Sequence, residues 1–360
     1  MGIQTVTGPI DASELGVTLP HEHLLLKAPP TYAERPPERD ADLFDAPITL
    51  DNYRRILRGV FWPKDALNLN DEPLAIDELK MFKRAGGSTL VDLTLSGIGR
   101  DPVALKRISV STGVRVIMGT GFFIEASHPA YVKSATVEDL ADEMIRDLQV
   151  GVSDTGIRAG IIGEMGVSPG KMLPQEEKAL RAAAIAHAKT NRPINVHTWG
   201  DPPENRTQMR VLDILVEEGV PPEKVGLSHM EQVKIPGPIP LTDWDYVASL
   251  AERGAYVLLD AFGQEWPWGA SWSLEAKNVV YMPSPTDFER AIGIVKLLEK
   301  GHGSKILVSQ DIWHKLRLKR YGGDGYDHLL VNVTRIFKFL GMKDETIRQL
   351  MVDNPRKFLQ

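Results

Sequence analysis

Two histidines separated by a single residue, His21 and His23, follow a short apolar run at residues 17–19 and a proline. In a β-strand, residues i and i+2 point to the same face, so both imidazoles can reach one metal ion. A lone His-x-His pair is a weak signal. However, further potential ligands end other strand-like apolar runs along the chain. These are Glu164, His197, His229 and Asp311.

Each of these six residues, taken singly, has an ordinary structural explanation, such as a helix N-cap for Asp311 or an ion pair for Glu164. Histidines with purely structural roles would not concentrate at strand ends. The other five of the nine histidines lie in expected helices or loops, and they are His128, His187, His302, His314 and His328. Jointly, six candidate ligands at the ends of five strands predict a metal centre.

Six ligands exceed the four that one tetrahedral ion needs, so two divalent ions fit better. We expect the histidines of the first strand and Asp311 to hold one ion. His197 and His229 would hold the other, and Glu164 would bridge the two. A water between two dications should ionise near neutral pH. Because the chain has no cysteine, the histidine and carboxylate ligands suit zinc, our first expectation, or manganese, cobalt or iron.

The elements that must position these ligands alternate along the chain. The expected strands are 17–19, 89–95, 114–119, 160–164, 194–197, 225–229, 256–260 and 306–311. The expected helices are 72–85, 137–148, 175–190, 208–218, 243–253, 286–300, 326–340 and 344–352. Eight strands alternating with helices predict an α/β fold, the (β/α)8 TIM barrel, whose strand C-termini converge on one mouth. The rival, an open doubly wound sheet, usually carries a G-x-G-x-x-G turn, which is absent here.

Bulk composition narrows the class of protein. The 360 residues, 42% hydrophobic and 25% charged, fit one barrel with insertions, so we expect a single domain over residues 1–360. The net charge of −6 gives no support to a nucleic-acid or polybasic membrane role. No apolar run approaches the ~20 residues that span a bilayer, and no signal-peptide pattern is visible. A cytoplasmic protein acting on a small molecule is expected.

Two long loops would lie on the mouth of such a barrel. The first, residues 24–70, includes an expected short helix around residues 52–58. This loop could act as a lid over the site. Alternatively, it is a surface insertion or an oligomer contact, and the sequence does not decide between these roles. The second, residues 261–283, carries three tryptophans that could wall a pocket or bury against a partner subunit. They are Trp266, Trp268 and Trp272.

An ordered set of short segments resembles the phosphotriesterase family of the amidohydrolase superfamily, most closely its phosphotriesterase-homology branch. The segments are Gly8–Ile10, Leu19–His23, Arg158–Ile162, Val196–Thr198, Leu227–His229, Ser309–Asp311, Gly322–Asp327 and Asp353–Leu359. They extend over essentially the whole chain. The resemblance implies a (β/α)8 barrel, a binuclear metal centre, hydrolysis and a homodimer.

The fourth strand departs from the pattern of the founding phosphotriesterases, which bridge their metals with a carboxylated lysine. This chain has no lysine between Lys133 and Lys171, and Glu164 stands in the fourth strand, as in the branch where glutamate takes that role. Glutamate carries its charge on a shorter stem, so the spacing or the pocket shape would differ. Efficient hydrolysis of organophosphate triesters is therefore less expected than hydrolysis of a carboxylic ester, lactone or amide.

Candidate substrate-binding residues follow the strands. Arg100 lies past the second strand and could meet an anionic group, and Lys315 and Arg317 belong to a basic loop after Asp311. Such cations could bind a phosphate or carboxylate by charge-assisted hydrogen bonds, or simply form a solvated loop. Phe123 occupies the aromatic position that lines the pocket in related enzymes, unless it is a core aromatic. Asp260 ends the seventh strand and could orient a ligand histidine.

The expected reaction is metal-assisted hydrolysis of a lactone or other carboxylic ester, including one with an anionic group. A metal-bridging hydroxide would attack the carbonyl carbon, and Asp311 would act as the catalytic proton acceptor. An amidase or a promiscuous phosphotriesterase on the same centre is the alternative. A third hypothesis is a metal-binding protein without catalysis, and the intact ligand set argues against it.

Overall fold

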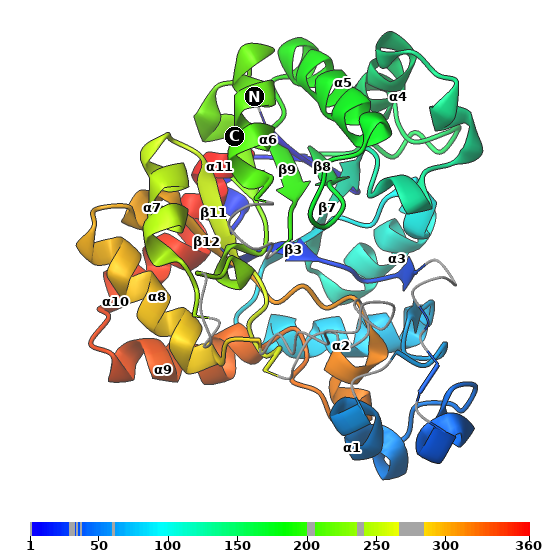
Figure 1. Cartoon of the computed structure of the whole chain (residues 1–360), viewed down its shortest axis with the longest axis vertical. Helices are drawn as coiled ribbons and strands as arrows, with labels where there is room; N and C mark the ends of the chain where they lie inside the picture. Colours follow the sequence, from blue (N-terminus) through cyan, green and yellow to red (C-terminus); the bar gives the residue numbers. More distant parts are fainter. Residues whose placement is uncertain are drawn as a thin grey trace.

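Eight parallel strands form a nearly closed barrel in the computed structural model, which describes residues 2–28, 33, 35–36, 38–59, 62–199, 206–235, 241–265 and 284–360. The strands are β3 (Thr18–Glu22), β6 (Thr89–Asp92), β7 (Arg115–Thr120), β8 (Ile161–Gly166), β9 (Ile194–His197), β10 (Val225–Leu227), β11 (Tyr256–Leu259) and β12 (Ile306–Val308). Each barrel strand pairs with the next one along the chain, and helices surround the sheet (Figure 1). The predicted TIM barrel is confirmed.

The barrel closes between its last and first strands by a different means. Among the described strands, β12 and β3 are the two edges of the eight-stranded sheet, and no strand pairing joins them. Instead, Ser309 Oγ donates to the backbone oxygen of His21 at 2.8 Å, and the Asp311 N–H donates to the same oxygen at 3.3 Å. The carboxylate of Glu22 accepts from Ser309 Oγ and from two backbone N–H groups of this segment. Side chains therefore supply much of the pairing that backbone supplies elsewhere.

Helices follow most of the strands, and their boundaries agree with the expected ones to within a few residues. They are α2 (Glu72–Arg84), α4 (Val137–Gln149), α5 (Pro174–Thr190), α6 (Gln208–Glu217), α7 (Trp244–Glu252) and α8 (Asp287–Glu299). The Asp71, Thr136 and Thr286 side chains accept hydrogen bonds from backbone N–H groups in the first turns. Such N-caps satisfy donors that the helix leaves unpaired.

The helices near the C-terminus differ from expectation. The run expected at 326–340 forms a π-helical turn, Leu329–Val333, before α9 (Thr334–Phe339). The last expected helix extends from α10 (Asp344–Arg348) through a second π-helical turn into α11 (Asn354–Leu359). A helix that the sequence analysis did not predict, α3 (Pro102–Thr112), lies between β6 and β7.

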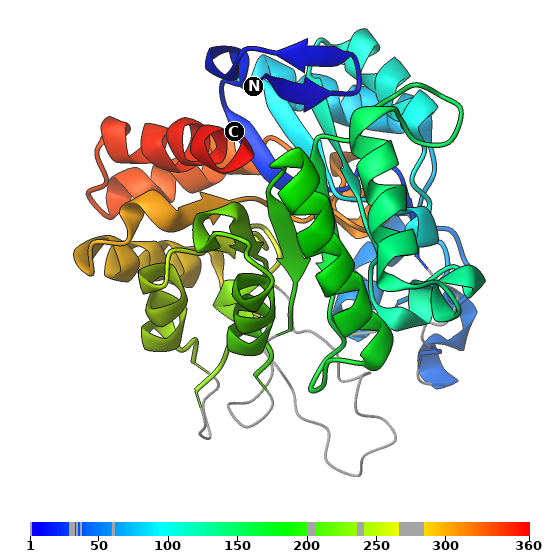
Figure 2. The same cartoon turned by 90° about the horizontal axis from the view of Figure 1, so that it is seen from above.

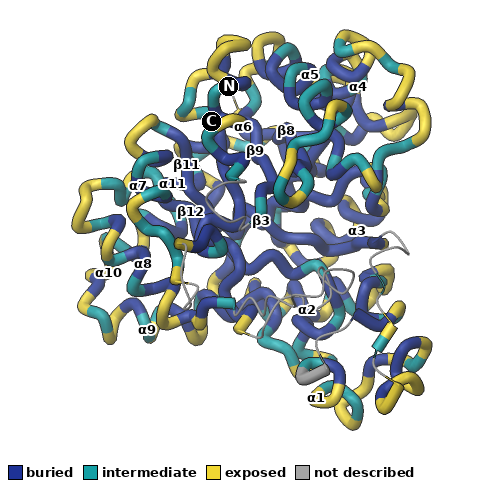
Figure 3. Tube along the Cα trace, in the orientation of Figure 1, coloured by how far each residue is buried: buried dark blue, intermediate teal, exposed yellow. Residues whose placement is uncertain are grey.

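The end of the barrel opposite the strand C-termini is closed by both ends of the chain. An antiparallel hairpin, β1 (Ile3–Thr5) with β2 (Gly8–Ile10), lies against the start of β7, where the Val6 N–H donates to Val116 O. Ile3 from the hairpin and Phe358 from α11 pack with strand residues in one buried cluster. Figure 2 shows the hairpin and the red C-terminal helices at this end. Figure 3 shows that the barrel interior is buried while exposure concentrates on the outer helices and loops.

The first long loop contains a short antiparallel pair, β4 (Leu26–Lys27) with β5 (Asn68–Leu69), and α1 (Leu50–Gly59) at the expected short helix. The remainder lies partly outside the described residues. The three tryptophans of the second long loop, Trp266, Trp268 and Trp272, lie outside the described residues altogether. Among the helices that the structure describes, none combines the length and apolar character needed to cross a bilayer.

Candidate metal centre

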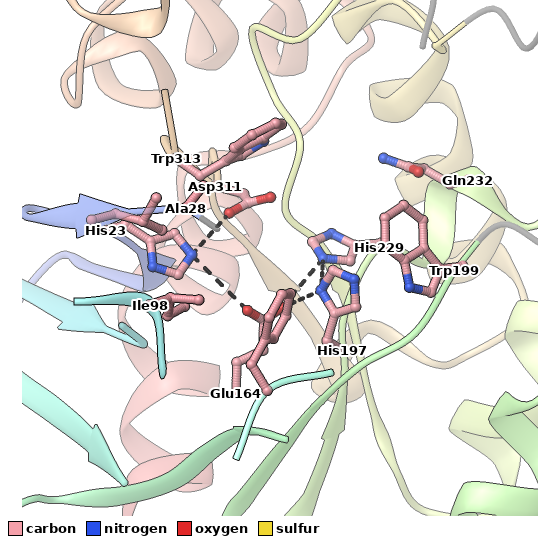
Figure 4. A pocket seen from close by; sticks show the side chains of 12 residues that line it. His23, Ala28, Ile98, Glu164, His197, Trp199, His229, Gln232, Asp311 and Trp313 are labelled. Carbon is pink, nitrogen blue, oxygen red and sulfur yellow. Dashed lines mark hydrogen bonds and ion pairs between the residues drawn. The ribbon is translucent and has the colours of Figure 1, made fainter. Parts of the chain in front are cut away.

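The six predicted ligands come together at the C-terminal mouth of the barrel. They lie on or directly after five strands, and all six residues are buried. Figure 4 shows the side chains of five of them around one cavity. The five are His23 after β3, Glu164 in β8, His197 at the end of β9, His229 after β10 and Asp311 after β12. The sixth, His21 in β3, is not among the lining side chains and has an exposed fraction of 0%.

The ligand atoms form two groups that share Glu164. In the first group, Asp311 Oδ1 lies 3.3 Å from His23 Nε2 and 3.5 Å from His21 Nε2. In the second group, Glu164 Oε1 lies 2.6 Å from His197 Nδ1 and 3.4 Å from His229 Nε2. The Glu164 carboxylate also reaches the first group, at 3.3 Å from His21 Nε2 and 4.0 Å from His23 Nε2. The Glu164 carboxylate therefore lies between the first group and the pair formed by His197 and His229.

Two divalent ions fit these donors. The first triad is His21, His23 and Asp311, and the second is Glu164, His197 and His229; within each triad the ligand atoms lie within 4.8 Å of one another. His21 Nε2 is buried and makes no hydrogen bond among the described residues. A buried imidazole nitrogen without a partner is costly, whereas imidazole and carboxylate together are the usual ligands of zinc and related ions.

Asp260, the first residue after β11 (Tyr256–Leu259), orients two of the histidines. Its Oδ2 lies 2.8 Å from His21 Nδ1, and its Oδ1 lies 2.8 Å from His229 Nδ1. Burial alone would raise the pKa of Asp260, but the His229 and His21 imidazoles outweigh burial and lower that pKa. The carboxylate thus stays charged and binds both Nδ1 atoms, which directs both Nε2 atoms toward the ligand cluster. This is the orienting role expected for Asp260.

The backbone around the ligands is unusual at three positions. His229 and Asp311 have φ angles of 65° and 49°, in the left-handed region that non-glycine residues rarely adopt and that clusters at functional sites. The His229 N–H donates to Asp260 Oδ1 at 2.9 Å, which helps to hold that conformation. Gly163, which precedes Glu164, has a φ of 124°, and a Cβ there would collide with the backbone oxygen of Asn195 on β9.

The ligands line a cavity of about 70 Å³. The other side chains that line it are Leu26, Ala28, Ile98, Phe123, Trp199, Gln232 and Trp313. Phe123 therefore lies in the cavity wall, with its ring 4.9 Å from the His197 ring. Trp199, Gln232 and Trp313 were not predicted from the sequence. Each follows a predicted ligand by two or three positions. Their place in the loops directly after the predicted ligands could therefore have identified them as lining residues.

The three predicted substrate-binding cations lie elsewhere. Arg100 is 6% exposed and pairs with Asp147 at 2.9 Å. Lys315 Nζ pairs with Asp65 Oδ1 at 2.6 Å. Arg317 is fully buried and donates to the backbone oxygens of Gln310 and Phe262.

None of the three is among the described residues that line the cavity. Their partners come from separate elements of the fold, which is why neighbouring residues in the sequence did not reveal the pairs.

The model of the phosphotriesterase family matches residues 1–359. The chain belongs to the phosphotriesterase family. Members of this family are metal-dependent hydrolases, so the chain is an enzyme of that class. The suspected family is therefore confirmed over essentially the full length.

Several known proteins are similar to this chain. N-acetyltaurine hydrolase of Xenopus tropicalis is 33% identical over 358 residues, which cover 99% of this chain and 97% of that protein. A resiniferatoxin-binding protein from Rhodobacter sphaeroides has 37% identity and a TM-score of 0.91, with 100% of this chain and 95% of that chain covered. A weak promiscuous lactonase, used as a template for engineering organophosphate hydrolysis, has 25% identity and a TM-score of 0.72, with full coverage of both chains.

Proposed function

We propose that this phosphotriesterase-family hydrolase is a binuclear metal enzyme that cleaves a lactone or other carboxylic ester. The observation that carries the proposal is the placement of the Glu164 carboxylate between His21 of the first triad and His197 of the second, at 3.3 Å and 2.6 Å. The similarity to a weak promiscuous lactonase supports the ester class.

A substrate with an anionic group was expected from three nearby cations, and this expectation loses support. Arg100 and Lys315 pair with carboxylates, Arg317 donates to backbone oxygens, and none of the three is among the described lining residues.

The roles of the residues follow from the two triads. His21, His23 and Asp311 would hold one ion, His197 and His229 the other, and Glu164 would bridge them. Two ions so held would polarise the scissile carbonyl and lower the pKa of a water enough for it to attack near neutral pH. Asp260 keeps His21 and His229 oriented through their Nδ1 atoms. We propose zinc as the native metal on the ligand chemistry.

Asp311 is the proposed catalytic proton acceptor. It lines the cavity and lies at the strand C-terminal mouth, where the scissile bond must sit to meet the ligands. Its carboxylate would accept the proton of the attacking water and return it to the leaving group. Its left-handed backbone conformation is held on both sides by hydrogen bonds to Glu22. The proton acceptor is therefore fixed in place before substrate binds.

An amide is the second candidate substrate, and one observation favours it. The similar Xenopus tropicalis protein, 33% identical over nearly the full chain, is an N-acetyltaurine hydrolase, and its substrate is an amide. Ester and amide hydrolysis require the same attacking water and the same proton acceptor, so the ligand geometry serves both. A promiscuous phosphotriesterase activity remains the weaker alternative, since glutamate replaces the carboxylated lysine of the founding enzymes.

Metal analysis combined with a substrate panel tests the proposal. We expect about two metal equivalents per chain and turnover of a lactone, an aryl ester or an N-acyl amine at neutral pH. One equivalent would remove the bridging role of Glu164. A fully metal-loaded protein inert toward lactones, esters, amides and phosphotriesters would favour the hypothesis of a metal-binding protein without catalysis.

We also propose that the enzyme acts as a homodimer in the cytoplasm, on a small-molecule substrate. The family resemblance supports the dimer. Light scattering on the purified full chain tests the assembly, and a monomer at micromolar concentration would contradict it. Fractionation of the source cells tests the compartment, where recovery with membranes or outside the cytoplasm would contradict the proposal.

A further inference from the structure

The walls of the cavity are apolar apart from the predicted ligands and one glutamine. Six apolar side chains line it, and they are Leu26, Ala28, Ile98, Phe123, Trp199 and Trp313. Figure 4 shows Trp313 beside Asp311 and Trp199 beside His197, on opposite sides of the cavity. The His197 and Trp199 rings lie 5.0 Å apart. Aromatic walls of this kind bind the apolar body of a ligand.

Gln232 supplies the single polar side chain among the described lining residues that is not a predicted ligand. It follows His229 by three positions, and its backbone N–H donates to His229 O at 3.0 Å. Figure 4 shows its amide directed toward the space between Trp199 and Trp313. A carboxamide is neutral and both donates and accepts hydrogen bonds, so it can orient a neutral polar group of a substrate.

No lysine or arginine occurs among the described residues that line the cavity. The cations predicted to meet an anion are engaged instead with Asp147, with Asp65 and with backbone oxygens. Among the side chains that the structure does not describe, the sequence contains two basic ones, Arg58 and Lys277. Beyond the scissile carbonyl, where the proposed metal ions would be engaged by that carbonyl and the attacking water, a substrate anion would meet apolar walls and the Gln232 amide among the described lining residues, which is unfavourable for a charge.

Resting on the proposed function, we propose that this site selects substrates that are neutral beyond the scissile carbonyl. The cavity, of about 70 Å³, has room for roughly five water-sized groups, so the part of the substrate that it encloses is small. The leaving alcohol or amine is apolar or aromatic and contacts Trp199 and Trp313, and Gln232 hydrogen-bonds to its neutral polar group. In the reaction, water oxygen bonds to the acyl carbon, the C–O or C–N bond breaks, and the leaving atom takes a proton.

This inference separates the chain from the activity named for the similar Xenopus tropicalis protein. N-acetyltaurine ends in a sulfonate, a permanent anion on the leaving amine. Hydrogen bonds from a neutral amide do not balance such a charge as an arginine or lysine does. The present site is therefore expected to accept N-acyl amines and esters of similar size while rejecting the sulfonate.

A matched substrate pair tests the inference on the metal-loaded enzyme. N-acetyltaurine is compared with N-[2-(methylsulfonyl)ethyl]acetamide, in which a methyl group replaces one sulfonate oxygen and removes the charge. We expect kcat/KM for the neutral amide to exceed that for N-acetyltaurine by on the order of 100-fold, because the anion finds no cationic side chain among the described lining residues. Equal rates, or a preference for N-acetyltaurine, would overturn the inference.

A second pair keeps the test independent of amide reactivity. It consists of 4-(methylsulfonyl)phenyl acetate and 4-sulfophenyl acetate, each rate divided by the rate of that ester with hydroxide alone. We expect the neutral ester to be preferred by at least about tenfold. Preference for the anionic ester would overturn the inference. If no member of either pair and no lactone is hydrolysed by enzyme with about two metal equivalents, the proposed function itself fails.

Binding of the two product phenols distinguishes a failure of this inference from a failure of the proposed function. Calorimetry on the metal-loaded protein compares 4-(methylsulfonyl)phenol with 4-hydroxybenzenesulfonate, and no catalysis is needed. Tighter binding of the neutral phenol supports the inference even in an inactive protein. Tighter binding of the sulfonate overturns it.

Gln232→Arg and its control Gln232→Met test the assigned side chain. Arginine at this position would supply the missing cation, so the ratio of kcat/KM for N-acetyltaurine to that for the neutral amide should rise about tenfold or more. Methionine has similar length without charge. It removes the proposed hydrogen bond to the neutral amide but supplies no cation, so it should lower kcat/KM for the neutral amide without raising kcat/KM for N-acetyltaurine, whereas Gln232→Arg should raise the latter. An unchanged ratio in a folded Gln232→Arg enzyme would contradict the position given to Gln232. The wild-type substrate pairs keep the inference testable if that variant does not fold.

Discussion

Glu22 holds the backbone on both sides of Asp311. Its Oε1 accepts from the Gln310 N–H at 2.8 Å, and its Oε2 accepts from the Ile312 N–H at 2.9 Å. Glu22 is fully buried, and burial raises its pKa to about 7. Because His21 and His23 flank Glu22, one side chain joins the end of β3, with two predicted ligands, to the turn that carries the third. It is a positioning residue of the proposed site.

Replacing Glu22 by glutamine should therefore impair the reaction more than substrate binding. The amide NH2 would face a backbone N–H, which leaves a buried donor without a partner and costs about 1–3 kcal/mol of unfolding free energy. We expect kcat to fall about tenfold or more with KM little changed, since the displaced Asp311 acts on the attacking water. Chemical unfolding and steady-state kinetics measure the two effects.

Glu14→Gln is the matched control, because Glu14 also accepts a backbone hydrogen bond, from Asp11, but at an exposed helix start. It should leave kcat unchanged. A Glu22→Gln enzyme with wild-type kcat would show that Glu22 is not needed to position Asp311.

Asp311→Asn should lower turnover while metal stays bound. Asparagine keeps an oxygen for the His21 and His23 side of the cluster but is not a base. Loss of a positioned proton acceptor typically costs 10²–10⁴-fold in rate, so we expect a fall in kcat of about this size. Elemental analysis of the same preparation is the companion measurement. Loss of both metals from this variant would mean that Asp311 is mainly structural.

Asp260→Asn should weaken metal binding without removing a ligand. The neutral amide cannot hold the Nδ1 atoms of His21 and His229 as the carboxylate does, and loss of such orienting partners typically lowers metal affinity about 10–100-fold. Competition with a chelator measures the affinity. Thr94→Val serves as the comparison, since Thr94 contacts only His23 Nδ1 among the predicted ligands, at 2.9 Å. Equal affinities for wild type and Asp260→Asn would rule out the orienting role.

Lys234 predicts a pH dependence of stability. Burial lowers the pKa of Lys234 to about 8, partly opposed by Glu231, whereas in the unfolded chain it is near ~10.4. Between these values the unfolded state binds the extra proton, so the free energy of unfolding should rise as pH increases from about 8 to about 10.4. The rise should be up to about 3 kcal/mol relative to Lys234→Met. Urea unfolding of both proteins across this pH range measures the rise. If the unfolding free energies of wild type and Lys234→Met changed with pH in parallel, the lowered pKa of Lys234 would be contradicted.

Agreement between sequence and structure is strongest where local pattern and barrel topology coincide. The six ligands and Asp260 could be found because each ends an apolar run, and parallel strands bring their C-termini to one mouth. The helix α3 carried a readable signal, the Asp101 N-cap followed by Pro102. Its many β-branched residues obscured the helical pattern. The predicted helices 326–340 and 344–352 could not show their π-helical turns, since packing rather than periodicity decides such turns.

The sequence by itself predicted the barrel, the candidate ligand residues and the division of those candidates into two groups, because residue type and strand periodicity are local properties. Tertiary structure alone decided which side chains face the cavity. Arg100, Lys315 and Arg317 find partners from other elements, while Trp199, Gln232 and Trp313 turn toward the ligands. The direction of a loop side chain depends on distant partners and on burial, and neither is encoded in the spacing of residues along the chain.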